Sequence, residues 1–225
     1  MKKIKIQNSR AKGRAGNKEY TVGKIVCVGR NYVEHAKELG NEVTEKPLIF
    51  LKPSSVLIFS GDKIIYPSFS TEMHHEVELV VLIGKKTKNV NLFEAEAAIS
   101  GYGVGLDMTL RDIQNQLKKK GHPWTIAKCF DTSAVISDFM LKENYMLTLS
   151  EEISLSVNGV IKQKDQLSKM IFNPAQLVEY ISSIMTLEEG DLVFTGTPAG
   201  VSKVNREDKL NAEITGIAKL ECDVV

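Results

Sequence analysis

Residues 74–84 read HHEVELVVLIG, an apolar run that predicts a strand in the interior of a sheet. Two glutamates, Glu76 and Glu78, interrupt this run. Because strand side chains alternate between faces, both glutamates point the same way, about 7 Å apart. A buried carboxylate is costly unless it is paired or bound to a metal. A divalent cation shared by the two glutamates would satisfy both, and oxygen ligands favour Mg²⁺, Mn²⁺ or Ca²⁺. The alternative is a solvated strand face.

Two histidines precede the glutamates. On a regular strand His74 shares the face of Glu76 and Glu78, while His75 lies on the opposite face. The two histidines therefore cannot bind one metal ion together, which argues against a His-His-Glu iron site. We expect each to be a hydrogen-bonded histidine at the end of the strand.

Strand patterns outnumber helix patterns along the rest of the chain. The expected strands lie at residues 3–7, 24–29, 47–52, 54–59, 63–67, 101–107, 124–130, 191–196, 210–216 and 218–225, with a hairpin at 153–163 that turns at Asn158-Gly159. The expected helices lie at residues 30–40, 91–100, 109–121 and 173–185. Many strands, few helices and no regular alternation predict a β-rich α+β fold and argue against a TIM barrel or a Rossmann sheet.

The first and third helices carry end signals. Asn31 is placed to cap residues 30–40, with Glu34 at the capping-box position and Gly40 after the last turn. Thr109 is placed to cap residues 109–121, which end at Gly121. These signals place a short helix after strand 24–29 and a longer one after strand 101–107.

Further candidate site residues lie near these helices. Asp107 ends a strand just before the third helix and is the natural third metal ligand, although it could merely face a helix N-terminus. Arg111 and Gln114 are three residues apart and share one helix face, which could meet an anionic substrate or solvent. His35 and Glu38 have the same spacing. A glutamate that orients a histidine makes a general-base dyad, but a surface pair has the same spacing.

Two more segments carry candidate residues. Lys128 lies within the expected strand 124–130, among apolar neighbours, so it either reaches water or points at a buried anion. Residues 194–201, FTGTPAGV, form a glycine-rich turn that could present backbone N–H groups and Thr197 to a carboxylate. The alternative is a plain turn without a binding function.

Composition narrows the class of protein. Of 225 residues, 29 are Lys or Arg and 28 are Asp or Glu, so net charge indicates no nucleic-acid partner. The basic residues near the N-terminus fit a solvated strand and loop, and the alternative is a nucleic-acid-binding arm, which no reader motif supports. Three scattered cysteines without a CxxC argue against disulfides and a thiolate zinc site. With no long apolar run and no signal-peptide pattern, we expect a cytoplasmic protein without membrane contact.

Five motifs occur in an order that resembles the fumarylacetoacetate hydrolase family: CVGRNYVEHAKELG, HHEVELVVLIG, GYGVGLDMTLRD, PWTIAKCFDTSAVIS and VFTGTPAGV. The chain is similar to the small, acylpyruvase-like members. The resemblance covers residues 24–225, the expected catalytic domain, and residues 1–23 add a strand and a basic loop to the same domain. It implies a mixed β-sandwich roll with a few flanking helices, a homodimer, and Mg²⁺ or Mn²⁺ in the site, with Ca²⁺ possible in a crystal.

The resemblance also implies roles for particular residues. Glu76, Glu78 and Asp107 match the metal ligands. His35 and Glu38 match the dyad that activates water, and Lys128 matches a position that contacts the substrate. The other positions expected to bind or lie near the substrate are Arg30, Arg111, Gln114 and Thr197.

The implied activity is the hydrolysis of a C–C bond in a small acylpyruvate or other 2,4-dioxo acid, through an enolate that the metal stabilises. Decarboxylation of oxaloacetate and isomerisation of a 2-hydroxyhepta-2,4-diene-1,7-dioate use the same kind of site and remain alternatives. A non-catalytic metal-binding protein is a rival of a different class.

Overall fold

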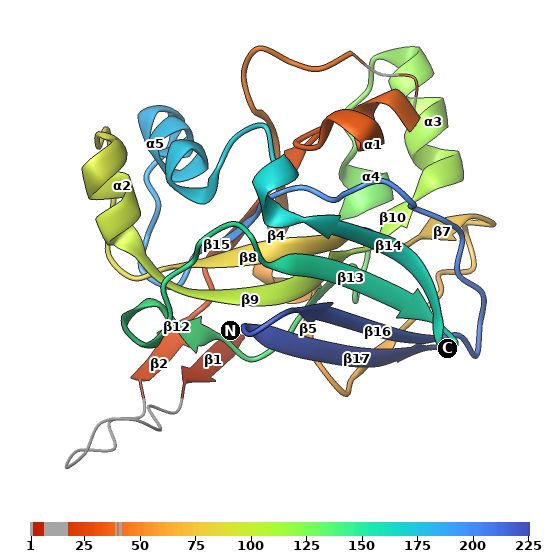
Figure 1. Cartoon of the computed structure of the whole chain (residues 1–225). Coiled ribbons are helices and arrows are strands. Elements are labelled where there is room, and N and C mark those ends of the chain that lie inside the picture. The colour runs from red at the N-terminus through yellow and green to blue at the C-terminus, as the bar shows by residue number, and fades with distance from the viewer. Residues whose placement is uncertain (1, 7–17, 39, 41) are drawn as a thin grey trace.

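The computed structural model describes residues 2–6, 18–38, 40 and 42–225. Over these ranges a larger and a smaller sheet pack face to face, with most of the helices gathered at one side (Figure 1). Residues 7–17, most of the expected basic loop, lie outside the described residues. The larger sheet is mixed, because β15 and β3 pair in parallel while β8 and β9 pair antiparallel. In order its strands are β4 (Leu48–Pro53), β3 (Lys24–Gly29), β15 (Leu192–Phe194), β8 (Val77–Ile83), β9 (Ile99–Asp107), β11 (Ala134–Ile136) and β5 (Leu57–Phe59), with β12 (Met140–Leu141) on β9.

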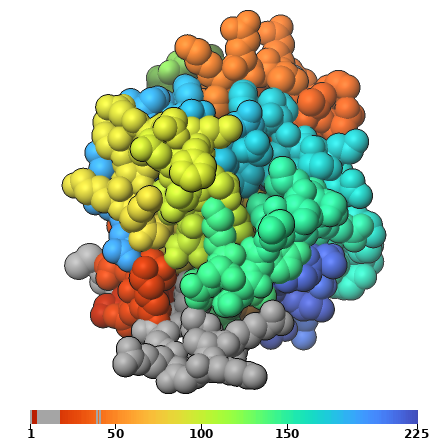
Figure 2. Space-filling model, turned by 60° about the vertical axis from the view of Figure 1, so that its left-hand side comes forward, coloured from red at the N-terminus to blue at the C-terminus, as the bar shows by residue number. Residues whose placement is uncertain are grey.

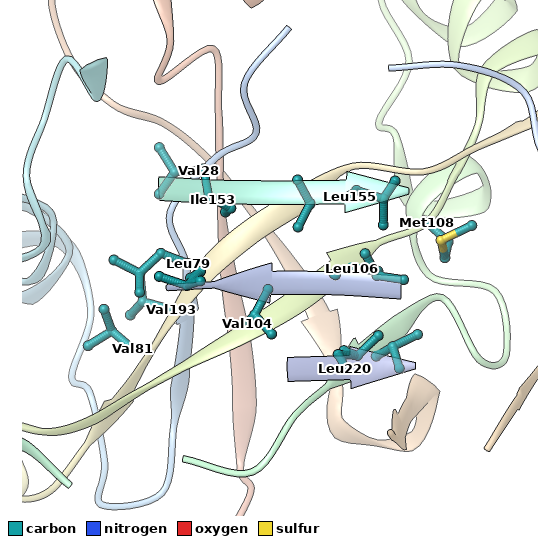
Figure 3. Close-up of a cluster of buried hydrophobic side chains, with 14 of the residues drawn as sticks. Val28, Leu79, Val81, Val104, Leu106, Met108, Ile153, Leu155, Val193 and Leu220 are labelled. Carbon is teal, nitrogen blue, oxygen red and sulfur yellow. The ribbon is translucent and has the colours of Figure 1, made fainter. Parts of the chain in front are cut away.

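The smaller sheet covers one face of the larger one. In order its strands are β14 (Val160–Gln166), β13 (Glu152–Val157), β16 (Lys209–Ile214), β17 (Ala218–Val224) and β6 (Lys63–Ile64). Figure 3 shows Ile153, Leu155 and Leu220 of this sheet near Leu79 and Leu106 of the larger one. All of these side chains are buried, so the main core lies between the sheets.

The other face of the larger sheet encloses a second core because the sheet curls. Val80, Leu82 and Phe194 belong to this core, together with Ile4 and Tyr20 of the strand pair β1 (Lys3–Ile6) and β2 (Lys18–Thr21). In the space-filling view the red β1–β2 pair lies below the yellow segment that contains α2 (Figure 2). A curled, strand-rich sheet with few helices confirms the predicted β-rich α+β fold.

The helices are short. They are α1 (Val33–Glu38), α2 (Leu92–Ala98), α3 (Arg111–Lys120), α4 (Thr125–Lys128) and α5 (Pro174–Ile184), with 3₁₀ turns at Ser54–Val56, Lys142–Asn144 and Leu167–Lys169. A short strand pair, β7 (Met73–His74) and β10 (Thr109–Leu110), leads into α3. No helix among the described residues is long and apolar enough to cross a membrane.

Four local predictions are wrong. Residues 54–56 form a 3₁₀ turn, so the strand expected at 54–59 begins only at Leu57. Residues 125–128 form the helical turn α4 instead of a strand, since a short apolar run does not separate helix from strand. Thr109 does not cap α3, because it pairs with His74 in β10 and its hydroxyl bonds to the Asp107 carbonyl. Asn31 does not cap α1, because its amide binds the Phe172 backbone and the Thr195 carbonyl.

Candidate metal centre

The three acidic residues meet at the junction of β8 and β9. Glu78 pairs with Gly105, and the Asp107 backbone N–H donates to the Glu76 carbonyl at 2.9 Å. This register brings Glu76, Glu78 and Asp107 to one face of the sheet, at the end of the second core. One oxygen of each lies within 4.8 Å of the others, and each residue is at most 5% exposed.

A glycine makes room on this face. A Cβ on Gly105 would lie 2.9 Å from the Val135 carbonyl and closer still to the side chains of Val80 and Phe194. Gly105 therefore lets Val80, Phe194 and the neighbouring strand pack closely beside Glu78.

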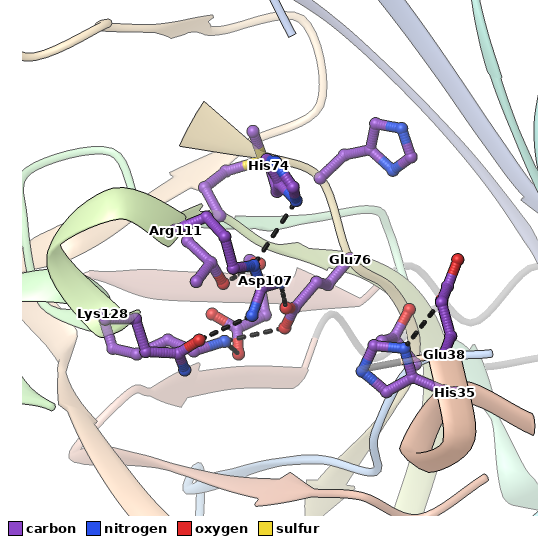
Figure 4. A network of polar contacts seen from close by, with 12 residues as sticks. His35, Glu38, His74, Glu76, Asp107, Arg111 and Lys128 are labelled. Atoms are coloured by element: carbon purple, nitrogen blue, oxygen red, sulfur yellow. Dashed lines mark hydrogen bonds and ion pairs between the residues drawn. The ribbon is translucent and has the colours of Figure 1, made fainter. Parts of the chain in front are cut away.

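Three buried cations surround two of the three carboxylates. Lys128 Nζ lies 2.7 Å from Glu76 Oε2 and 2.7 Å from Asp107 Oδ2, and Arg111 pairs with Glu76 (Figure 4). Lys52 Nζ lies 2.7 Å from Asp107 Oδ1, but it directs its hydrogen bonds to the Ser133 and Met108 carbonyls. Asp107 Oδ1 is therefore ion-paired with Lys52, although it accepts no well-aligned hydrogen bond from any described residue.

Glu78 is the carboxylate without a compensating charge. Among the described residues it has no Lys or Arg at ion-pair distance, and it accepts one hydrogen bond from the Gly196 N–H at 2.7 Å. Burial, together with the nearby Asp107 and Glu76 charges, raises the pKa of Glu78 well above its usual value. Burial also acts to raise the pKa of Glu76, but Lys128 and Arg111 outweigh it and hold that pKa below its usual range.

These observations fit a divalent cation. Three buried carboxylates supply the hard oxygen ligands that Mg²⁺ or Mn²⁺ prefers. A cation between them would bind Asp107 Oδ1, which accepts no hydrogen bond from a described residue, and would supply the positive charge that Glu78 lacks. Glu76, Glu78 and Asp107 are the residues that would hold it.

The three carboxylates and Lys128 line one pocket, and His35 lines it too, with Glu38 beside His35. His35 Nδ1 is 3.4 Å from Glu38 Oε2, and Figure 4 shows this pair on the far side of Glu76 from Lys128. The Gly200 backbone N–H donates to both carboxylate oxygens of Glu38, at 3.1 Å each, and so holds the Glu38 side chain in place. Burial lowers the pKa of His35 against the raising effects of Glu76 and Glu38, so its imidazole is neutral near pH 7 and can accept a proton.

The pocket walls carry the remaining expected residues. Arg111 donates to Gln114 Oε1 at 2.6 Å, so these two side chains face the pocket as a unit. Thr197 and Arg30 line the same pocket. Arg30 makes no hydrogen bond or ion pair with a described residue. Its backbone φ of 60° is left-handed, which is uncommon for a side chain of this size.

Sequence reasoning missed three residues at or beside the pocket. Lys118 lines it, and burial together with Arg111 and Arg30 lowers the pKa of Lys118 to about 8. Lys52 is buried in β4, and the signal that could have found it was a lysine at the end of the apolar run 47–52. Gln163 is buried beneath Thr197 and left no comparable signal, because it lies in a polar strand.

The two histidines before Glu76 are hydrogen-bonded, as expected. His74 lies 3.0 Å from Glu72 and 3.4 Å from the Arg111 Nε that donates to it, and His75 contacts Gln163 and Ser202 at 2.9 Å each. Neither belongs to the acidic cluster found among the described residues.

Comparison with known proteins places the chain in a family. The family model described as fumarylacetoacetate (FAA) hydrolase, C-terminal, matches residues 24–225. The chain is 46% identical to the mitochondrial oxaloacetate decarboxylase of Dictyostelium discoideum, over 93% of this chain and 97% of that protein. It is 42% identical to the mitochondrial oxaloacetate tautomerase of Homo sapiens, over 87% of this chain and 89% of that protein.

A solved structure agrees with these matches. The crystal structure of fumarylpyruvate hydrolase from Pseudomonas aeruginosa, in complex with Mn²⁺ and pyruvate, has a TM-score of 0.90 and 36% sequence identity to this chain. The similarity covers 99% of this chain and 95% of that one. The curled sheet, the five ordered motifs and these comparisons together show that the chain belongs to the fumarylacetoacetate hydrolase family.

Proposed function

We propose that the protein is a divalent-metal-dependent enzyme that hydrolyses a C–C bond in a small acylpyruvate or other 2,4-dioxo acid. The observation that carries this proposal is one pocket lined by three buried carboxylates, Lys128 and His35, with Glu38 contacting His35 from behind. When bound by Glu76, Glu78 and Asp107, Mg²⁺ or Mn²⁺ supplies a Lewis acid that stabilises negative charge on substrate oxygens.

The chain's own residues account for the proton transfers. His35 Nδ1 faces Glu38, and Nε2 makes no hydrogen bond with a described residue. Nε2 therefore takes a proton from water, whose oxygen attacks the distal ketone, while Glu38 stabilises the imidazolium. The C–C bond breaks, one fragment leaves as a carboxylic acid, and the other as the enolate of pyruvate. The proton held on His35 then returns to the enolate carbon.

Lys128 and the pocket wall have supporting roles. Burial acts to lower the pKa of Lys128, but Asp107 and Glu76 raise it above its ordinary value, so the ammonium keeps its charge. A permanent cation beside the reacting oxygens favours a developing enolate. Arg111, Gln114 and Thr197 offer hydrogen bonds that would orient the carboxylate of a 2-oxo acid.

Oxaloacetate is a second candidate substrate, for decarboxylation or tautomerisation. Arg30 and Lys118 both line the pocket, and neither has a carboxylate partner among the described residues. Two such cations favour a substrate with a second carboxylate, and the two curated relatives are named for oxaloacetate. Isomerisation of a dioate is a further alternative, because a structure of 2-hydroxyhepta-2,4-diene-1,7-dioate isomerase from Mycobacterium marinum is 34% identical, with a TM-score of 0.81.

A homodimer in the cytoplasm completes the proposal. Leu51 on β4 and Ile126 on α4 are 47% and 59% exposed. Because β4 is an edge strand among the described residues, exposed apolar side chains there suit an interface between copies. The cysteines Cys27, Cys129 and Cys222 are free thiols, which suits a reducing compartment.

The test is the release of pyruvate from acetylpyruvate, fumarylpyruvate and oxaloacetate, together with the enol-to-keto conversion of oxaloacetate followed by ultraviolet absorbance, with Mg²⁺, Mn²⁺ or EDTA. Metal-dependent turnover of an acylpyruvate that His35→Ala abolishes supports the hydrolase. Turnover of oxaloacetate alone supports the second candidate. Metal binding without turnover of any of these substrates or of the diene dioate, unchanged by His35→Ala, would indicate a non-catalytic protein.

A further inference from the structure

The strand β14 buries one residue, and that residue is polar. Gln163 is 1% exposed, whereas its neighbours Lys162 and Lys164 are exposed. A buried amide must find partners for both its oxygen and its nitrogen. Gln163 contacts Thr197 Oγ1 at 2.7 Å and the Pro198 carbonyl at 2.8 Å on one side.

On its other side Gln163 contacts two groups of the segment that leads to the acidic cluster. These are the Val77 N–H at 3.1 Å and His75 Nδ1 at 2.9 Å. The Val77 N–H can only donate, so the atom that faces it must be the amide oxygen. The Pro198 carbonyl can only accept, so the atom that faces it must be the NH₂ group. The partners at both ends of the amide give the same assignment of oxygen and nitrogen, so the orientation of the Gln163 amide is fixed.

This orientation determines what the Thr197 hydroxyl can do. Since Gln163 donates to Thr197 Oγ1, that oxygen already serves as an acceptor. The hydroxyl proton of Thr197 has no acceptor among the described residues, and Thr197 lines the pocket that holds the acidic cluster. The proton is therefore left for an acceptor inside the pocket.

We propose that Gln163 is a positioning residue that makes Thr197 a hydrogen-bond donor to the carboxylate of the substrate. This inference rests on the proposed function, in which the substrate is a 2-oxo acid. His75, held through Nε2 by Ser202 at 2.9 Å, donates from Nδ1 to the Gln163 oxygen and so keeps the amide in this orientation. This role connects His75, which points away from the glutamates, to the site.

The turn that Gln163 holds also contacts both halves of the site. The Gly196 N–H donates to Glu78, and the Gly200 N–H donates to Glu38. Gly200 packs directly on β14, where a Cβ would collide with the Lys162 carbonyl, and its φ of 97° suits glycine. Gln163 thus anchors the middle of a turn whose ends contact a candidate metal ligand and the dyad.

A double-mutant cycle on the full-length Mn²⁺-loaded protein tests the inference, with oxalate as the probe. We expect Gln163→Leu and Thr197→Val each to raise the oxalate Kd about 10-fold or more, since a hydrogen bond to a charged group is lost. The double variant should bind oxalate no more weakly than Thr197→Val. The Kd for Mn²⁺ should stay within about 2-fold, because the acidic cluster is intact. Gln166→Leu on the same strand is the matched control and should bind oxalate as the wild type does.

Several outcomes overturn the inference. An unchanged oxalate Kd in Gln163→Leu would contradict it. So would a Gln163→Leu substitution that weakens oxalate binding by the same factor in Thr197→Val as in the wild type, because the two residues would then act independently. Wild-type protein that binds Mn²⁺ but neither oxalate nor pyruvate would refute the proposed function as well as this inference.

If Gln163→Leu does not fold, Gln163→Glu is the second variant. Its ionised carboxylate can only accept, so it would take the Thr197 proton that the ligand needs. We expect it to weaken oxalate binding at pH 8 at least 10-fold, and an unchanged affinity would contradict the role of Gln163.

Discussion

Replacing Lys52 by methionine removes one cation from a buried ionic cluster. Its Nζ lies 2.7 Å from Asp107 Oδ1 and 2.7 Å from the Ser133 carbonyl, and its side chain is 0% exposed. Breaking a buried ion pair by removing one partner costs about 3–5 kcal/mol. Methionine fills a similar volume and Lys128 still contacts Asp107, so we expect the lower end, about 3 kcal/mol.

The same substitution should favour metal binding. The formal charges of the cluster cancel between Glu76, Glu78, Asp107 and Lys52, Lys128, Arg111. Loss of one positive charge leaves the acidic residues more attractive to a divalent cation. A tenfold tighter Kd would return about 1.4 kcal/mol at saturating Mn²⁺.

Calorimetric melting with EDTA and with Mn²⁺ measures both effects. In EDTA we expect the Tm of Lys52→Met to fall by about 6–12 °C, and in Mn²⁺ we expect about half of that difference to disappear. Lys164→Met is the matched control, because Lys164 forms an exposed ion pair with Glu152 at 2.9 Å and should matter by less than about 0.5 kcal/mol. A loss in EDTA below about 1 kcal/mol, or a loss that Mn²⁺ increases, would refute the reasoning.

Three further predictions concern the pocket. Glu38→Ala leaves His35 without the carboxylate that stabilises its imidazolium, so kcat should fall about 10²-fold or more while the Kd for oxalate changes little; an unchanged kcat would remove the dyad from the mechanism. The pKa of Lys118 lies at about 8, so its positive charge is lost as pH rises through that value. Between pH 7 and pH 9 the KM for oxaloacetate should therefore rise relative to the KM for a substrate with one carboxylate, such as acetylpyruvate. The Lys118→Met variant should lack this rise. A rise of equal size in the wild type and in Lys118→Met would show that Lys118 does not bind the second carboxylate. Gly200→Ala places a Cβ against the Lys162 carbonyl, so we expect lower Tm and lower kcat together; a variant with wild-type values would show that the turn tolerates displacement.

The sequence predicted elements whose signals are local. Period-2 alternation placed Glu76 and Glu78 on one face, and Asn158-Gly159 marked a hairpin turn in which both residues have positive φ. The capping signals failed at Asn31 and Thr109, because tertiary partners compete for the same side chains.

Long-range pairing was harder to predict. Lys52 and Lys128 converge on Asp107 from segments 55 and 21 residues away, and only the sheet order brings them together. Gln163 lies 34 residues from Thr197 on a strand of the other sheet, so no periodicity in its own segment could indicate the contact. The candidate metal ligands could be predicted from strand alternation and family motifs. The residues that hold those ligands in place could not, because their positions depend on tertiary packing.

The most direct measurement is a Mn²⁺ titration of the metal-free protein, followed by electron paramagnetic resonance and by pyruvate release from the same samples. We expect one ion per chain, and activity that rises in proportion to the occupied fraction. Glu78→Gln, which removes the carboxylate that lacks a cation partner, should weaken Mn²⁺ binding and shift the activity curve by the same factor. Full activity in the metal-free protein, or Mn²⁺ binding that Glu78→Gln leaves unchanged, would contradict the assignment of this cluster as the catalytic metal centre.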